Sequence, residues 1–167
     1  MKVIRQFAQG IALIDPLKKV GEEGQYRRLP ADYEGLEAVV TAARVTGLEI
    51  RHYYKNLATE AGEVVSSQLI ITELPPGHVQ PFHTHLKLHE MTIVHEGRIV
   101  NIESATLQET DLDDIREYGV WLNSGDLVIE EPGKRHTQMN PGTVYAVTYT
   151  VQTARIPLEE FPADWNR

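Results

Sequence analysis

Two histidines and a glutamate lie close together in the middle of this 167-residue chain, in the segment from Pro75 to Gly97. His83 and His85 are two residues apart, so in an extended strand both imidazoles would point to the same face. Glu90 follows at an odd offset from His85, which would place it on the opposite face of a straight strand. We therefore expect the chain to bend around residues 86–89, so that Glu90 enters the same interior from a neighbouring strand. Two imidazoles and a carboxylate that converge in this way can bind a divalent metal.

A third imidazole is available in a second segment, from Gly125 to Asn140. Pro132 and Gly133 predict a tight turn there, and His136 follows at the start of another strand. The chain has no cysteine, which excludes thiolate metal sites, disulfides and a catalytic thiol. The remaining nitrogen and oxygen donors suit iron(II), manganese, nickel, zinc or copper.

Both segments resemble the sequence motifs of the cupin family. The first motif is a Gly, five residues, His-x-His, four residues, Glu, six residues and Gly, and this chain meets every spacing with Gly77, His83, His85, Glu90 and Gly97. The second motif is matched by Gly125, Pro132, Gly133, His136 and Asn140. This second match departs from the family pattern at the turn. The family pattern is Pro-x-Gly, whereas Pro132 and Gly133 are adjacent in this chain. The resemblance covers residues 48–152.

The resemblance implies an all-β fold, a cupin β-barrel of the jelly-roll type, with one divalent metal bound inside by His83, His85, Glu90 and His136. Iron, manganese, nickel and zinc are the expected metals, and copper is less favoured. We expect an enzyme that acts on a small oxygen-rich metabolite, through dioxygenase chemistry or through Lewis-acid isomerase, lyase or cyclase chemistry. Glu90 is the expected catalytic base, with a cavity tyrosine as the alternative. The alternative is a cupin that binds or senses a small ligand without catalysis.

The rest of the chain predicts the elements that must position this site. Segments with alternating or β-branched residues predict strands at residues 48–54, 64–74, 91–102, 121–130 and 143–152, with a hairpin signal at residues 95–98. Before Gly47 the spacing of apolar residues predicts helices at residues 4–19 and 32–47. We therefore divide the chain into a partly helical N-terminal extension (1–47), a cupin barrel (48–152) and a C-terminal arm (153–167).

Strand parity assigns roles to polar residues near the motifs. Gln138 shares parity with His136 and is expected to support the site. Thr92 shares parity with Glu90 and is expected to face the interior, where a packed hydroxyl is favoured over a functional role. His95 has the opposite parity and is expected to point away. His78 and His89 have no predicted ligand role, although His89 is next to Glu90 and could support it. Tyr145 and Tyr149 share one strand face, which the sequence leaves open as exterior or cavity-lining.

Two further clusters are less specific. Residues 51–54, which are Arg, His, Tyr and Tyr, could reach a carboxylate substrate, although a solvated strand face is the more ordinary explanation. The acidic run from Glu109 to Asp114 lacks the ligand spacing of a calcium site and predicts a solvated loop.

Composition limits the partners. The net charge of −8 would repel phosphate backbones and anionic headgroups, so neither nucleic acid nor a membrane surface is an expected partner. No segment reaches the roughly 18 apolar residues of a membrane span, and Gln9, Gly10 and Pro16 interrupt the N-terminal apolar stretch, which argues against a signal peptide. We expect a cytoplasmic protein that binds a small-molecule substrate or ligand. Its terminal extensions favour a homodimer.

Overall fold

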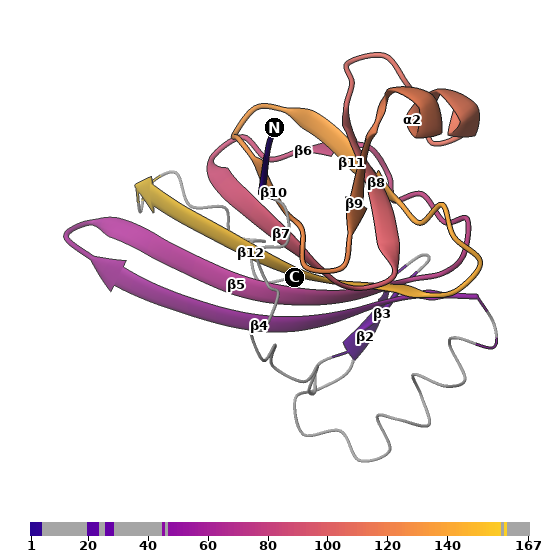
Figure 1. Ribbon diagram of the computed structural model, residues 1–167. Coiled ribbons are helices and arrows are strands. Elements are labelled where there is room, and N and C mark those ends of the chain that lie inside the picture. The colour runs from indigo at the N-terminus through magenta and orange to yellow at the C-terminus, as the bar shows by residue number, and fades with distance from the viewer. Residues whose placement is uncertain (5–19, 24–25, 29–44, 46, 158, 160–167) are drawn as a thin grey trace.

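A computed structural model of the chain describes residues 1–4, 20–23, 26–28, 45, 47–157 and 159 (Figure 1). The helices predicted at residues 4–19 and 32–47 lie outside this set, except at Ile4, Val45 and Gly47. Ile4 ends a short strand, and Gly47 has a left-handed backbone with φ of 71°, which is common where a helix ends. The remainder of both helices stays a prediction. Within the described residues, no helix has the length and apolar character needed to cross a membrane.

Two β-sheets pack face to face, which confirms the predicted all-β fold class (Figure 1). The larger sheet has the order β1-β10-β7-β12-β5-β4-β3-β2, and its strands are β1 (Lys2–Ile4), β2 (Val20–Glu23), β3 (Tyr26–Arg28), β4 (Glu49–Glu60), β5 (Glu63–Leu74), β7 (Leu88–Glu96), β10 (Leu127–Glu130) and β12 (Ala146–Pro157). The smaller sheet has the order β6-β11-β8-β9, and its strands are β6 (His83–Thr84), β8 (Arg98–Glu103), β9 (Val120–Asn123) and β11 (Arg135–Met139). All the pairs are antiparallel except β3 with β4.

From β6 onward the chain passes back and forth between the two sheets, so two sequence predictions are wrong in detail. Residues 91–102 are not a hairpin, because β7 and β8 belong to different sheets. Residues 121–130 form two strands, β9 and β10, which also lie in different sheets. A glycine with positive φ lies at each of these two crossings, Gly97 between β7 and β8 with 73° and Gly125 between β9 and β10 with 88°. This backbone lets the chain turn sharply without steric strain.

The other predicted strands are present with different ends. β4 continues to Glu60, β5 covers the predicted segment, and β12 begins at Ala146 and continues to Pro157. β12 therefore extends past residue 152, and β1, β2 and β3 join the large sheet from the N-terminal region. The proposed division at residues 47 and 152 stays a prediction.

Apolar side chains fill one end of the space between the sheets. Leu74, Val94 and Val128 of the large sheet pack there against Ile99 and Leu122 of the small sheet, all of them buried. A second cluster lies on the outer face of the small sheet, where helix α2 (Leu112–Tyr118) buries Ile115 against it. The acidic run predicted as a loop is thus partly helical, because Asp113 and Asp114 form the first turn of α2, where carboxylates are favourable.

The outer face of the large sheet carries a third apolar cluster. Ile71, Tyr149 and Ile93 are cross-strand neighbours on β5, β12 and β7, and they pack with Val147 and Leu69.

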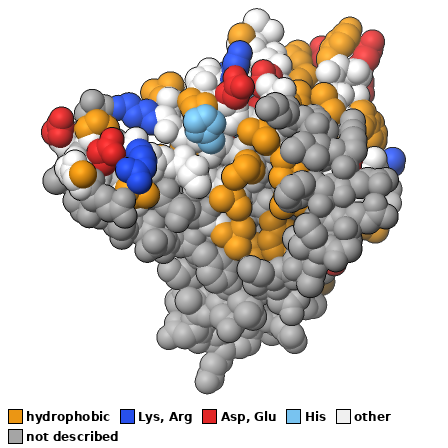
Figure 2. All heavy atoms as spheres, turned by 60° about the vertical axis from the view of Figure 1, so that its left-hand side comes forward, with side chains coloured by type: hydrophobic (Ala, Val, Ile, Leu, Met, Phe, Trp, Pro, Cys, Tyr) orange, Lys and Arg blue, Asp and Glu red, His pale blue; other side chains and the backbone are white. Residues whose placement is uncertain are grey.

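In the space-filling view, hydrophobic side chains gather in a band on one face of the molecule (Figure 2). Such bands are common where subunits meet. The homodimer stays a prediction.

We expect the glycine at the crossing between β7 and β8 to be required by its contacts as well as by its backbone. A Cβ at Gly97 would lie 3.2 Å from Cα of Ala146, whereas a Cβ at Gly77, which has a similar φ of 72°, would meet nothing within 4 Å. Gly77→Ala should cost about 1 kcal/mol in free energy of unfolding from backbone strain, and Gly97→Ala about 2–3 kcal/mol because it adds the clash. Urea unfolding of both variants measures the difference. Equal losses would show that the close contact contributes nothing.

Candidate metal centre

The four predicted ligands come together between the two sheets, with donor atoms that all lie within 4.8 Å of one another. His83 on β6 is the register partner of His136 on β11, so both rings project from the small sheet on the same side. Glu90 comes from β7 in the large sheet. The chain bends at Leu86 and Lys87, between His85 and β7, as the odd spacing predicted.

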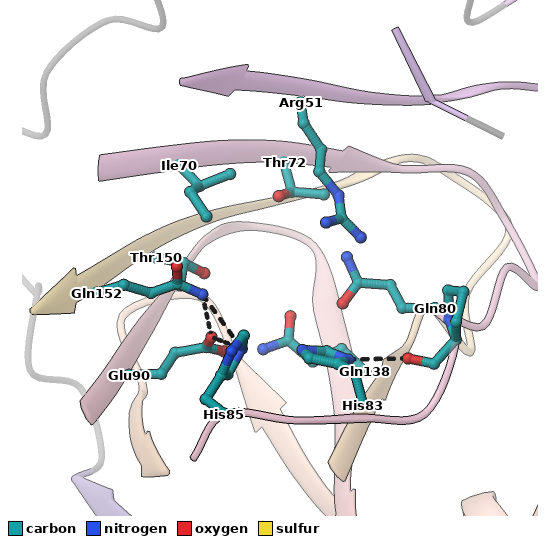
Figure 3. A pocket seen from close by; sticks show the side chains of 11 residues that line it. Arg51, Ile70, Thr72, Gln80, His83, His85, Glu90, Gln138, Thr150 and Gln152 are labelled. Atoms are coloured by element: carbon teal, nitrogen blue, oxygen red, sulfur yellow. Dashed lines mark hydrogen bonds and ion pairs between the residues drawn. The ribbon is translucent and has the colours of Figure 1, made fainter. Parts of the chain in front are cut away.

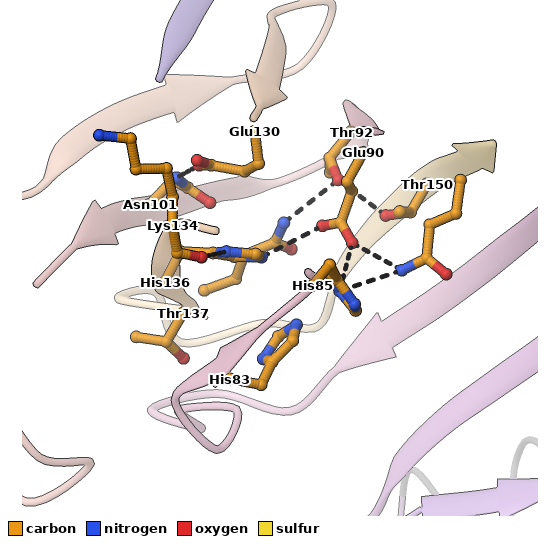
Figure 4. Close-up of polar contacts among 12 residues, drawn as sticks. His83, His85, Glu90, Thr92, Asn101, Glu130, Lys134, His136, Thr137 and Thr150 are labelled. Atoms are coloured by element: carbon orange, nitrogen blue, oxygen red, sulfur yellow. Dashed lines mark hydrogen bonds and ion pairs between the residues drawn. The ribbon is translucent and has the colours of Figure 1, made fainter. Parts of the chain in front are cut away.

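The three imidazoles surround one point, and backbone carbonyls orient two of them, His83 and His136 (Figure 4). Their ring centroids are 4.5 to 5.6 Å apart. Nδ1 of His83 lies 2.9 Å from the carbonyl oxygen of Pro81, and Nδ1 of His136 lies 3.0 Å from that of Lys134. A carbonyl has no hydrogen to donate, so each Nδ1 must carry the proton, which leaves the Nε2 lone pair as the donor. Hydrogen bonds of this kind fix the tautomer of metal-ligating histidines.

One buried nitrogen marks where an ion fits. Nε2 of His136 is buried and makes no hydrogen bond within the described residues. The nearest carboxylate oxygen, Oε1 of Glu90, lies 3.6 Å away, which is beyond hydrogen-bonding distance. Two donors at about 2.1 Å on opposite sides of a metal would be about 4.2 Å apart, so a cluster spanning 4.8 Å needs only a small contraction. The residues present therefore fit a divalent metal.

The electrostatics of the cluster suit a cation. Burial alone would raise the pKa of Glu90, but its contacts with His136, His85 and Gln152 outweigh burial and bring the pKa well below its usual range. Burial lowers the pKa of His83 to about 4, so this imidazole is neutral near pH 7. Burial would also lower the pKa of His136, but the adjacent Glu90 carboxylate raises it overall. An ionised carboxylate beside imidazoles that can lose their protons is the state that metal binding requires.

The turn of the second motif ties the two ligand segments together. Gly133 has φ of 82°, and its N–H donates to the carbonyl oxygen of His85 at 2.8 Å. The guanidinium of Arg135, next to His136 in sequence, stacks 4.2 Å from the ring centre of Phe82, next to His83. Pro132 and Gly133, although adjacent, therefore still form a turn. This turn holds the segment that carries His136 against the segment that carries His85.

A polar cavity of about 230 Å³ opens beside the cluster (Figure 3). His83, His85 and Glu90 form part of its wall, and the other lining residues include Arg51, Ile70, Thr72, Gln80, Thr150 and Gln152. Because a water molecule occupies about 30 Å³ of liquid, the space corresponds to about eight waters. It lies below the roughly 300–1,000 Å³ of drug-sized sites. The cavity therefore suits a small polar molecule.

Most of the parity predictions near the site are confirmed. Gln138 lines the cavity and donates from its amide to the buried Thr92 hydroxyl at 3.2 Å. His95 contacts the ring of Tyr149, which belongs to the apolar cluster on the outer face, so both point away from the site. His89 is exposed on β7. Tyr145 donates its hydroxyl to the carbonyl oxygen of Leu48 and does not line the cavity.

Sequence reasoning missed Gln152, which holds the ligand carboxylate. Its Nε2 donates to Oε2 of Glu90 at 2.6 Å and lies 3.3 Å from Nε2 of His85 (Figure 3). Gln152 on β12 is the register partner of Glu90 on β7. Gln152 lies at the end of the strand predicted at residues 143–152. The sequence does not indicate that this strand pairs with β7.

A buried carboxylate at the other side of the cavity was also missed. Glu49 is 1% exposed and accepts hydrogen bonds from Nε of Arg51 at 2.5 Å, Nε2 of His78 at 2.6 Å and Nε2 of Gln80 at 3.0 Å. Burial would raise the pKa of Glu49, but the hydrogen bond from His78 and the charge of Arg51 outweigh burial and lower it. His78 is thus a structural partner of this group.

No family model and no curated protein matches the chain. Similar solved structures include cupin domains. The Schizosaccharomyces pombe Cnp3 cupin domain is 13% identical with a TM-score of 0.44, over 62% of this chain and 64% of that one. Oxalate oxidase is 20% identical with a TM-score of 0.43, over 60% of this chain and 55% of that one. The chain thus spans less than two thirds of the length of either.

The architecture of the chain itself decides the fold. Strands cross repeatedly between two facing sheets, glycines of both motifs have positive φ, and the four motif ligands converge inside. The chain has a cupin fold. A Cupin 2 conserved barrel domain protein from Salinispora arenicola CNS-205, 20% identical with a TM-score of 0.41 over 61% of this chain and 74% of that one, is a further similar structure.

Removal of two of the four candidate ligands should abolish metal binding by this protein. We expect one divalent ion per chain in the wild type and none in the double variant His83→Ala, His85→Ala, because two of the four donors are lost. The matched control is His89→Ala, His95→Ala, which removes two imidazoles that point away from the site. Elemental analysis after metal loading and gel filtration measures the stoichiometry. One ion per chain retained in the His83, His85 double variant would refute the ligand assignment.

The buried Glu49 should make stability depend on pH. A carboxyl with a lowered folded-state pKa stabilises the protein above its unfolded pKa of about 4.3 and loses this contribution as pH falls through the folded value. Glu49→Gln should therefore cost about 2 kcal/mol in free energy of unfolding at pH 7, and less below about pH 4. Urea unfolding across this range gives the difference from the wild type, with Glu117→Gln on exposed helix α2 as the control. A cost that does not change with pH would contradict the ionised state of Glu49.

Proposed function

We propose that this cupin is a metal-dependent enzyme that acts on a small oxygen-rich metabolite at the centre formed by His83, His85, Glu90 and His136. The observation that carries the proposal is that three of these residues, His83, His85 and Glu90, are on the wall of the polar cavity. A structural metal site is closed by protein ligands, whereas a catalytic site keeps an open position for substrate. The position of the cavity supports the second kind of site.

The donor set favours iron(II), manganese, nickel or zinc. It offers three imidazoles and one carboxylate and no thiolate, which is the ligand chemistry these borderline and harder ions prefer. When bound, such an ion supplies Lewis acidity to a substrate oxygen, or electron exchange if it is redox-active. Glu90 would balance part of its charge, and Gln152 would hold the carboxylate in place.

The cavity wall would select for oxygen-rich substrates. Hydroxyls of Thr72 and Thr150 and amides of Gln80, Gln138 and Gln152 line the space. A substrate with carbonyl and hydroxyl groups replaces the hydrogen bonds that water makes with these side chains. An apolar substrate would leave them unpaired, at a cost of about 1–3 kcal/mol for each buried group.

The role of Glu90 as a base stays a prediction, and its electrostatics favour the role of ligand. A general base works best when its pKa lies near the working pH. The pKa of Glu90 is instead well below its usual range because the carboxylate is held by Gln152, His85 and His136. Such a carboxylate is a weak base and a good metal ligand.

The function is tested by turnover of small oxygen-rich compounds with protein loaded with each metal. A panel of uronates, hydroxy acids and diketones should contain at least one compound that is converted to product, and chelation of the metal should stop the reaction. Product analysis and oxygen consumption identify the reaction class. If a compound binds the loaded protein and is recovered unchanged while no other is turned over, the protein is a ligand-binding cupin and the proposal fails.

Glu90→Gln separates the two roles of this residue. If Glu90 is a ligand, the variant binds metal more weakly, and turnover per bound metal changes by less than about tenfold, since general-base catalysis accounts for about 10²–10⁴-fold where it operates. Metal content and turnover are measured on the same sample. A fall of a hundredfold or more in turnover per bound metal would assign the base role to Glu90.

A further inference from the structure

Arg51 is the permanently charged cation among the residues that line the cavity. It is on β4 in register with Thr72 on β5, and cross-strand partners place their side chains on the same face. Thr72 lines the cavity too, so both side chains face inward. With 19% of its side chain exposed, Arg51 does not lie on the solvated strand face that the sequence favoured as the ordinary explanation.

The guanidinium faces the metal ligands across the cavity. Figure 3 shows Arg51 entering from one side, beside Gln80, while Glu90 and His85 lie on the opposite side. A ligand that fills the cavity would therefore contact the metal with one end and Arg51 with the other. The space of about 230 Å³ suits a molecule short enough to span it once.

Glu49 fixes the orientation of Arg51. Its buried carboxylate accepts from Nε of the guanidinium at 2.5 Å and is itself held by His78 and Gln80. A guanidinium carries its N–H donors in a rigid planar fork, and the bond to Glu49 is made by Nε. This contact orients the plane of the Arg51 guanidinium, which stays protonated at any physiological pH. A planar fork held in this way matches the geometry of a carboxylate.

We infer that the ligand of this centre is a small carboxylate, bound through its carboxylate group by Arg51 and through an oxygen at its other end by the metal. The inference rests on the proposed function and narrows it. Hydroxy acids, keto acids and uronates meet both requirements. Neutral diketones and polyols do not, because they give Arg51 no negative partner.

The test is a two-point binding experiment with simple carboxylates on manganese-loaded protein. Acetate can occupy the metal alone, whereas malonate, succinate and glutarate can reach both the metal and Arg51 over increasing spans. At least one dicarboxylate should bind the wild type more tightly than acetate does. In Arg51→Gln the affinity for that dicarboxylate should fall about tenfold or more, since a hydrogen bond to a charged group is lost, and the affinity for acetate should not change. Isothermal titration calorimetry measures both.

Two further variants complete the design. Arg155→Gln removes the same charge from an exposed position on β12 and should bind every probe as the wild type does. Arg51→Lys keeps the charge but not the planar fork, so its affinity should fall between those of the wild type and Arg51→Gln. This variant also tests the inference if Arg51→Gln, which leaves Glu49 without its cation, does not fold.

The outcomes separate the two proposals. Normal metal content with dicarboxylate affinity unchanged in both Arg51 variants would overturn the inference and leave the proposed metal enzyme intact. If no dicarboxylate binds the wild type more tightly than acetate does, the inference is also overturned and the proposed metal enzyme stays intact. A wild-type protein that binds no metal under loading would remove the proposed function, and the inference with it.

Discussion

The structure is organised around one buried negative charge. Glu90 is 5% exposed and ionised, and an isolated carboxylate in such a place would cost several kcal/mol. Gln152 donates to it, and His85 and His136 lie beside it from two other segments of the chain. These contacts offset part of the cost, and a divalent cation among the imidazoles would offset much more. The crossings between the sheets are needed because Glu90 and the three histidines must approach one point from opposite sides.

A polar interior limits where an apolar core can form. Along β7 the inward positions change from Glu90 through Thr92 to Val94, so the site and the apolar cluster between the sheets occupy opposite ends of one barrel. The barrel therefore buries further apolar residues on its outer faces, under α2 on the small sheet and around Ile71 on the large one. This division lets the cavity stay polar while the protein buries enough apolar surface to fold.

The two sides of the cavity carry opposite charges, which favour one orientation of a bound molecule. On one side, the anionic Glu90 and the neutral His83 imidazole favour a cation. On the other side, Arg51, which Glu49 holds in place, favours an anion. Under the proposed function, a small molecule in the cavity would be oriented with one end toward the cluster of His83, His85 and Glu90 and the other toward β4. Orientation of this kind accounts for much of the rate acceleration in many enzymes.

The sequence by itself determined the fold class, the four converging residues and the bend between His85 and Glu90, because two-residue spacing and positive-φ glycines are local properties of the chain. It did not determine that β7 and β8 lie in different sheets, since a hairpin and a crossing begin with the same turn residues. The contacts of Gln152 with Glu90, and of Glu49 with Arg51, His78 and Gln80, came from the tertiary structure alone. They depend on which strands pair and in which register, and pairing is decided by packing between segments far apart in sequence, which no local pattern encodes.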